Sequence, residues 1–157
     1  MNSLTAFKKS KMESKNKIRL FLVDDDAIFL KLLEVDFLQL GDFTVETFSS
    51  GEQCIANLSS RPDVIILDYH LHLDEINNDA MNGIETLDKI KAINADMPVI
   101  ILSAQDKIEV AVNCLHHHAA DYVVKSETAF MRLQKIIGII LSQRKLAKQL
   151  SWYMDRM

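Results

Sequence analysis

Short runs of aliphatic residues that each stop at a polar or charged side chain constrain the fold more than any other feature of this chain. These polar positions are the acidic cluster at residues 24–26, Asp68, Ser103 and Lys125. Uninterrupted aliphatic runs between amphipathic stretches are typical of buried parallel strands that alternate with helices. Because ligands of such sheets bind outside the carboxyl ends of the strands, we expect all four positions to meet in one pocket.

That pocket would bring together three carboxylates, a hydroxyl and an ammonium. They belong to Asp24, Asp25, Asp68, Ser103 and Lys125. A packed core would not collect these groups, because burying unpaired charges costs too much free energy. Carboxylate oxygens are the ligands that Mg²⁺ prefers, and a lysine ammonium binds phosphoryl oxygens. The sequence therefore predicts a site for a divalent metal ion and a phosphoryl group.

Length, composition and charge limit the class of protein. The chain has 157 residues, of which 48% are hydrophobic, so it can bury one substantial core but has no room for a second full domain. Its formal net charge of −4 argues against direct nucleic-acid binding. The sequence shows neither an apolar stretch long enough to span a bilayer nor a secretory signal, so we expect a cytoplasmic protein with no membrane contact.

Five strand-then-helix repeats can be traced along the chain. Strands are expected at residues 18–23, 43–48, 64–68, 99–102 and 121–124. The helices between them should end at Gly41, start after Ser50, span residues 83–95, start after Asp106 and open at Ser126. Right-handed crossovers turn this order into an α/β fold, a doubly wound five-stranded parallel sheet with helices on both faces.

Four segments carry a resemblance to a known family. They read LFLVDDD from Leu20, VIILDYH from Val64, VIILSA from Val99 and ADYVVK from Ala120. In this order they resemble the receiver domain of two-component response regulators, whose flavodoxin-like fold is shared with the bacterial chemotaxis regulator. The resemblance covers residues 17–141. It implies a receiver domain there. Residues 1–16 are rich in lysine and serine without periodic apolar residues, which predicts a disordered basic tail. The apolar spacing beyond residue 141 predicts a helical extension at residues 142–157.

The resemblance implies a role for each residue of the predicted pocket. Asp68 would accept a phosphoryl group from a histidine kinase or a phosphotransfer protein. Mg²⁺ would be bound by Asp25 and Asp68 directly, by Asp24 through water, and by the backbone carbonyl of His70. Lys125 would contact the phosphoryl oxygens. Such a protein is a signalling module, which catalyses only its own phosphorylation and dephosphorylation, and its output partner would be another protein.

The resemblance also implies a switch and a means of setting its lifetime. Ser103 would hydrogen-bond the phosphoryl group, and Tyr122 would turn inward to fill the space that the serine leaves. The positions of His70 and Gln105 are those at which family members tune the attack of water on the phosphoryl group. We expect the switch to shift the protein-interaction face formed by the fourth helix, the fifth strand and the fifth helix.

The chain departs from the family pattern after Asp68. An insertion of about seven residues, which we place at residues 73–79, lengthens the loop between Asp68 and Met81. A mostly polar insertion belongs on the surface, where it costs little loop-closure entropy. We expect it to control the phosphoryl lifetime or the choice of partner and to leave the fold intact.

Two other functions fit part of the pattern. In a haloacid-dehalogenase-like phosphatase, Asp24 would be the nucleophile of an Asp-x-Asp motif, but the role of Asp68 would then be unexplained and no paired acidic motif follows Lys125. In a pseudo-receiver the module would bind its partner without phosphorylation. The presence of Asp24, Asp25, Asp68 and Lys125 argues against a pseudo-receiver. The enlarged loop after Asp68 keeps this alternative open.

The C-terminal extension leaves two alternatives for its own arrangement. Apolar residues follow a nearly regular spacing of three and four, interrupted by Gln143: Ile136, Ile139, Leu146, Leu150 and Tyr153. This spacing is typical of a short dimerising helix, which would make the protein a homodimer. A helix that folds back onto its own domain is the other alternative, because two heptads are marginal alone.

Overall fold

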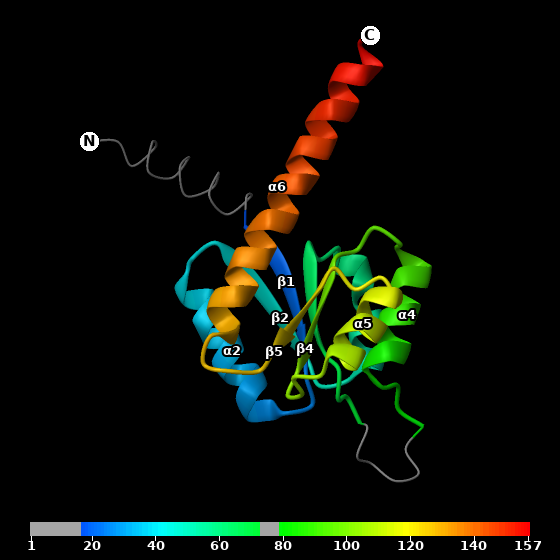
Figure 1. Ribbon diagram of the computed structural model, residues 1–157. Helices are drawn as coiled ribbons and strands as arrows, with labels where there is room; N and C mark the ends of the chain where they lie inside the picture. The colour runs from blue at the N-terminus through cyan, green and yellow to red at the C-terminus, as the bar shows by residue number, and fades with distance from the viewer. Residues whose placement is uncertain (1–16, 73–78) are drawn as a thin grey trace, which may run out of the picture.

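The computed structural model describes residues 17–72 and 79–157, and its centre is one parallel sheet (Figure 1). The strands are β1 (Ile18–Val23), β2 (Phe43–Phe48), β3 (Val64–Asp68), β4 (Val99–Ser103) and β5 (Asp121–Val124). They lie in the order β2-β1-β3-β4-β5. This confirms the flavodoxin-like, doubly wound fold. The expected tail at residues 1–16 and residues 73–78 of the predicted insertion lie outside the described residues.

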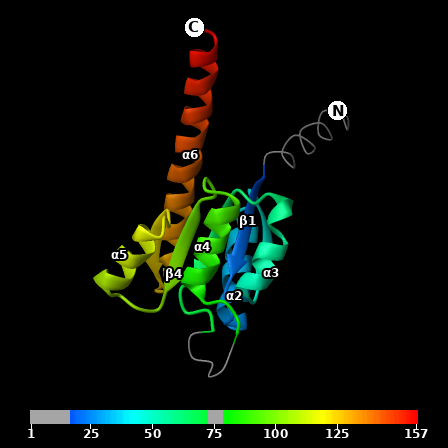
Figure 2. The same cartoon turned by 90° about the vertical axis from the view of Figure 1, so that its right-hand side faces the viewer.

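Helices cover both faces of the sheet (Figures 1 and 2). They are α2 (Ala27–Gln39), α3 (Gly51–Ala56), the 3₁₀ helix η1 (Leu58–Ser60), α4 (Gly83–Ile93), α5 (Ile108–His116) and α6 (Ala129–Asp155). The core side chains of α2 and α6 pack on one face. Those of α3, α4 and α5 pack on the other. The sheet is therefore the middle of three layers, which explains why its central strands β3 and β4 are buried along their whole length and aliphatic on both sides.

Alternation along each strand divides the core into two clusters. In β1, Phe21 and Val23 join the cluster under α3, α4 and α5, while Leu20 and Leu22 join the one under α2 and α6. All five residues of β3 are buried, Asp68 among them. Strand β3, which ends at the expected phosphoacceptor Asp68, is thus packed on both faces. This packing keeps the Asp68 carboxylate in a fixed position.

Local capping signals located some helix ends correctly. Gly41, with φ +81°, follows the end of α2, and the Ser50 hydroxyl accepts the Gln53 amide at the start of α3. The expected starts at Asp106 and Ser126 are wrong. The extended backbone of Lys107 delays α5 to Ile108. The residues after Ser126 form a turn, in which the Ala129 amide donates to the Ser126 carbonyl, so that α6 begins at Ala129.

Helix α6 is continuous and stands out from the body of the protein (Figure 1). Leu133 and Ile137 are buried against the sheet. Two turns further on, the Arg144 guanidinium donates to the backbone carbonyls of Asp63 and Asp96, both at 3.3 Å. Every residue from 145 to 157 is exposed, so this segment does not fold back onto its own domain. None of the described helices has the length and hydropathy that a bilayer crossing requires.

Candidate functional site

Three carboxylates meet at the carboxyl edge of the sheet. Strands β1 and β3 are neighbours with Val23 opposite Leu67, so the residues that follow them lie side by side. One carboxylate oxygen from each of Asp24, Asp25 and Asp68 lies within 4.8 Å of the others. Asp24 and Asp68 are buried, and Asp25 is exposed. This set of oxygens fits a divalent cation approached from solvent.

The lysine that follows the edge strand β5 supplies the positive charge of the pocket. The Lys125 ammonium donates to Asp24 Oδ2 at 2.8 Å and lies 3.5 Å from Asp68 Oδ1. It also lies 4.5 Å from the centre of the Phe29 ring. Burial acts to lower the pKa of Lys125, but the hydrogen bond to Asp24 and the charge of Asp68 outweigh it, so the pKa is raised. The ammonium therefore stays charged beside the carboxylates.

One ammonium does not neutralise this pocket. Burial, followed by the negative charge of Asp24, raises the pKa of Asp68 from its ordinary 3.8 to about 7. The charge of Lys125 and a 3.2 Å hydrogen bond from the His70 amide act in the opposite direction and are too weak to cancel the rise. A cation bound here would relieve the repulsion and displace the proton, so the residues present fit Mg²⁺.

A second group of polar side chains extends from the end of β4. The buried Ser103 hydroxyl accepts the Gln105 amide at 3.1 Å and lies 3.3 Å from His70 Nε2. The Tyr122 hydroxyl donates to the backbone carbonyl of Gln105. A movement of Ser103 would therefore disturb contacts that reach both His70 and Tyr122.

The structure thus brings together the residues that the sequence assigned to one pocket. Asp24, Asp25, Asp68 and Lys125 form its charged part. The hydroxyl, imidazole, amide and phenol of Ser103, His70, Gln105 and Tyr122 are linked beside it. The metal contact expected of the His70 carbonyl stays a prediction.

Three contributors had no signal in the sequence. Phe29 lies under the Lys125 ammonium, although the two residues are far apart in the chain. The His72 amide donates to Asp25 Oδ2 at 3.3 Å, in a residue with φ +54°. The first residue of α4, Gly83, packs against the backbone that follows Asp68. All three contacts join separate parts of the fold, so no local sequence pattern predicts them.

Gly83 is required by the close approach of α4 to the end of β3 at Asp68. A Cβ at this position would lie 2.6 Å from the Asp68 carbonyl oxygen and 2.7 Å from that of Tyr69. Backbone atoms cannot rotate away as a flexible side chain can, so the strand end itself would have to move. We expect Gly83→Ala to lower the free energy of unfolding by about 1–3 kcal/mol, measured by urea denaturation.

Gly138, in the interior of α6, provides the matched control. A Cβ there meets nothing within 4 Å. Because alanine favours a helix over glycine, Gly138→Ala should raise the free energy of unfolding by about 0.5–1 kcal/mol. The two substitutions add the same methyl group with opposite expected signs. A stabilised Gly83→Ala variant would show that α4 does not press on the Asp68 backbone.

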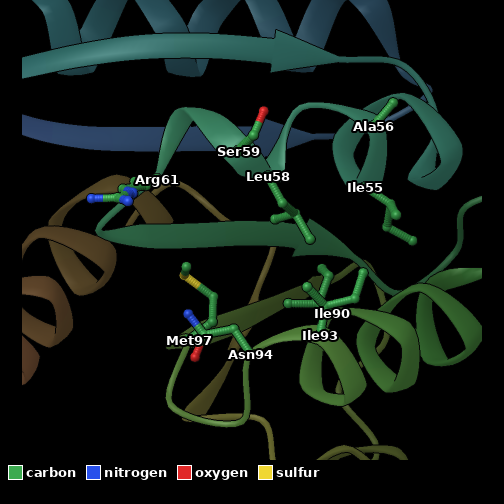
Figure 3. Close-up of a pocket in the computed structure, with 9 residues that line it drawn as sticks. All are labelled: Ile55, Ala56, Leu58, Ser59, Arg61, Ile90, Ile93, Asn94 and Met97. Atoms are coloured by element: carbon green, nitrogen blue, oxygen red, sulfur yellow. The ribbon is translucent and has the colours of Figure 1, made fainter.

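The groove shown in Figure 3 lies away from this chemistry. Its volume is about 570 Å³, and it is bounded by α3, η1, α4 and the turns that lead into β3 and β4. Ile55, Leu58, Ile90 and Met97 supply apolar surface, and Arg61 is the charged residue of its lining. These residues precede strands β3 and β4 rather than follow them. The groove therefore lies at the amino-terminal ends of the strands, whereas Asp68 lies at a carboxyl-terminal end.

Comparison with known proteins finds a matching family and related sequences. Residues 20–137 match the family model described as the response regulator receiver domain. The chain is 35% identical over 108 residues to the transcriptional regulatory protein PrrA of Mycobacterium leprae, covering 68% of this chain and 43% of that protein. It is 33% identical over 136 residues to the protein-glutamate methylesterase/protein-glutamine glutaminase of Clostridium acetobutylicum, covering 83% of this chain and 37% of that enzyme.

Solved structures show the same similarity. A receiver domain of DrrB activated by BeF3 is 26% identical, with a TM-score of 0.63, and the match covers 78% of this chain and 98% of that one. A CheY-like receiver domain protein from Methanospirillum hungatei has a TM-score of 0.68 at 24% identity, over 82% of this chain and 98% of that one, which supports the fold. The family match covers most of the chain and the acidic pocket lies where the fold requires it. The chain therefore belongs to the response regulator receiver domain family of two-component signalling.

Proposed function

We propose that this receiver domain accepts a phosphoryl group on Asp68 from the phosphorylated histidine of a histidine kinase or phosphotransfer protein. The observation that carries the proposal is the geometry of the pocket. Three carboxylates reach within 4.8 Å of one another, and Lys125 Nζ lies 3.5 Å from Asp68. In this arrangement a nucleophile, a cation site and a binding group for phosphoryl oxygens share one edge of the sheet.

The transfer would use each group of the pocket. A carboxylate oxygen of Asp68 forms a bond to phosphorus while the bond from phosphorus to the donor imidazole breaks, and the electron pair stays on the imidazole nitrogen. Asp24, Asp25, Asp68 and the His70 carbonyl would hold Mg²⁺, which when bound reduces the repulsion between the carboxylate and the phosphoryl oxygens. Lys125 would bind a phosphoryl oxygen, since it already lies between Asp24 and Asp68.

The phosphatase alternative requires Asp24 to be the nucleophile. Both Asp24 oxygens already accept hydrogen bonds, Oδ1 from the Asp26 amide at 2.9 Å and Oδ2 from Lys125. These contacts hold Asp24 in an ion pair with Lys125, and an Asp24 nucleophile would leave the buried Asp68 without a role. This favours Asp68 as the acceptor.

Locating the acyl phosphate separates the three functions. The protein is treated with acetyl phosphate and Mg²⁺, and the modified residue is identified by mass spectrometry. We expect the phosphoryl group on Asp68. Modification of Asp24 would support the phosphatase, and a chain that takes up no phosphoryl group would support the pseudo-receiver.

The contacts of Ser103 support a role in switching. Its hydroxyl is positioned by Gln105 and His70, and Gln105 in turn accepts the Tyr122 hydroxyl. We propose that Ser103 moves to the phosphoryl group and that Tyr122 follows it. Because the His70 side chain and Gln105 both contact Ser103, they also lie where they could govern the approach of water and thus the phosphoryl lifetime.

Replacing Ser103 tests this coupling. Ser103→Ala should still be phosphorylated on Asp68 but should lose the conformational change that follows. Backbone amide spectra with and without beryllofluoride should then show smaller shifts in α5 and β5 than in the parent. Ser59→Ala, which removes an exposed hydroxyl in η1, is the control and should behave as the parent. Equal shifts in Ser103→Ala and the parent would rule the coupling out.

The output of the whole protein is a separate proposal. The chain spans less than half the length of the two relatives described above, one a transcriptional regulator and the other an esterase. Their different names mean that neither activity can be transferred to this chain. We propose a division into the receiver at residues 17–141 and the extension at residues 142–157, with a protein as the direct output partner.

A further inference from the structure

We propose that the projecting end of α6 pairs with the same segment of a second copy of this chain in a parallel two-stranded coiled coil. Six residues repeat at alternating spacings of four and three, which is the a and d pattern of such helices. They are Ile139, Gln143, Leu146, Leu150, Tyr153 and Met157, and we call them the α6 seam. The proposal does not depend on phosphorylation of Asp68.

The seam lies on a part of the helix that its own domain does not cover. The domain contacts α6 through the buried Leu133 and Ile137, through the partly buried Ile136, Ile140 and Leu141, and through Arg144. Because successive helical residues point about 100° apart, the seam faces away from the direction of Leu133, Ile137 and Arg144. Its apolar side chains are 51% exposed at Ile139, 64% at Leu146, 61% at Leu150, 63% at Tyr153 and 102% at Met157. Both views show this part of α6 standing clear of the sheet and its helices (Figures 1 and 2).

Exposed apolar side chains of this size are stabilised when a binding partner removes them from water. Large contiguous apolar patches on a soluble surface mark interaction sites. A helix of about a dozen residues that is not packed against its own domain is also marginal in water, and residues 145–157 are all exposed. Pairing along the seam would remove both costs at once.

The charges around the seam favour a second copy as the partner. A two-fold pair brings each surface patch against itself, so like charges on the patch would repel. The residues that flank the seam are Ile140, Ser142, Ala147, Gln149, Met154 and Arg156. Arg156 is the single charge among them, and it lies at the end of the helix. Lys145 and Lys148 point away from the seam, which is therefore compatible with its own copy.

Gln143 determines the direction of the pair. It is the polar residue at an a position of the seam, between Ile139 and Leu146. In a parallel pair in register, a positions face each other, so the two glutamine amides can hydrogen-bond across the interface. In an antiparallel pair a faces d, and each amide would be buried against an apolar side chain without a partner. Since buried polar groups need hydrogen bonds, the parallel arrangement is favoured.

The seam is short, so its pairing should depend on concentration. It spans less than three heptads, or about 30 Å at about 1.5 Å per residue. Sedimentation velocity of the full chain over a concentration series should show a monomer that converts to a dimer. In the Leu150→Glu variant, a carboxylate would be buried against its copy, and we expect the dissociation constant to rise at least about 100-fold.

Lys148→Glu is the matched control, because it introduces the same side chain on the opposite side of the helix. It should dimerise as the parent does. Leu150 is 61% exposed in the single chain, so Leu150→Glu should remain folded, which circular dichroism would verify. A parent that stays monomeric throughout the series, or two variants with the same dissociation constant, would overturn the proposal and leave the seam for a different partner.

A cysteine placed on the seam tests the parallel direction. In a parallel pair, residue 153 of one copy meets residue 153 of the other, so Tyr153→Cys should form a disulfide-linked dimer under mild oxidation. Lys148→Cys, on the outer side, should not. The native thiols of Cys54 and Cys114 are buried and should not interfere. Equal crosslinking at the two positions, or none at Tyr153→Cys, would contradict the parallel arrangement.

Discussion

Replacing Asp25 with alanine is expected to abolish phosphorylation by acetyl phosphate in the presence of Mg²⁺. Asp25 contributes the exposed oxygen of the three-carboxylate cluster, the one that a hydrated ion reaches first. Without it, two buried carboxylates and one ammonium remain, which is a poor site for a divalent cation. Because the ion contributes several kcal/mol to the transfer, we expect the initial labelling rate to fall more than about 100-fold.

Asp26→Ala is the control for the loss of an acidic residue. The Asp26 side chain accepts the Ile28 and Phe29 amides at 3.1 Å, so it caps α2 and belongs to the helix rather than the pocket. Its replacement should lower the free energy of unfolding by about 1 kcal/mol and leave labelling intact. If Asp25→Ala labels as fast as the parent and Asp26→Ala does not, the metal ligands are misassigned.

Replacing Asp68 with asparagine is expected to stabilise the fold at alkaline pH in the absence of divalent cations. The folded protein holds the pKa of Asp68 at about 7, whereas the ordinary value is 3.8. Between these two values the native state binds the proton and the unfolded state does not, so the parent loses stability as pH rises from about 4 to about 7. The loss is complete above pH 7. At pH 8 we expect Asp68→Asn to be more stable by about 2–4 kcal/mol.

Urea denaturation at pH 5, 6, 7 and 8 with a chelator present would measure this effect. The parent should lose stability across the series relative to Asp68→Asn. Asp42→Asn, at an exposed position, should follow the parent. Added Mg²⁺ should stabilise the parent more than the asparagine variant, because the ion would bind the cluster that the carboxylate completes. Parallel pH profiles for the parent and Asp68→Asn would show that the pocket already compensates the charge of Asp68.

The sequence by itself determined the sheet and the place of the pocket. The central strands of a sheet covered on both faces are aliphatic along their length, and β3, with five buried residues, shows why such runs are easy to find. A polar residue such as Asp68 at the end of such a run interrupts an otherwise apolar pattern. Parallel strands place their carboxyl ends at one edge, so Asp24, Asp25, Asp68 and Lys125 could be assigned to one pocket before any contact was known.

Only the tertiary structure decided which partners these groups have. The bond between Lys125 and Asp24 joins residues 101 positions apart, and the support of Lys125 by Phe29 and the approach of Gly83 to Asp68 likewise cross the fold. The pKa of Asp68 depends on burial and on Asp24, which are properties of the packed state. The residues next to a position in the sequence do not predict the contacts that it makes with distant elements of the fold.

The course of the helices shows the same division. Gly41 and Ser50 mark helix ends correctly because their effects are local, a left-handed residue in one case and a hydroxyl that accepts a nearby amide in the other. Asp106 fails as a cap because the backbone of Lys107 is extended. The spacing from Ile139 to Tyr153 predicted a helix with an apolar stripe. Whether that stripe met its own domain depended on where Arg144 anchors α6, which the packed domain alone decides.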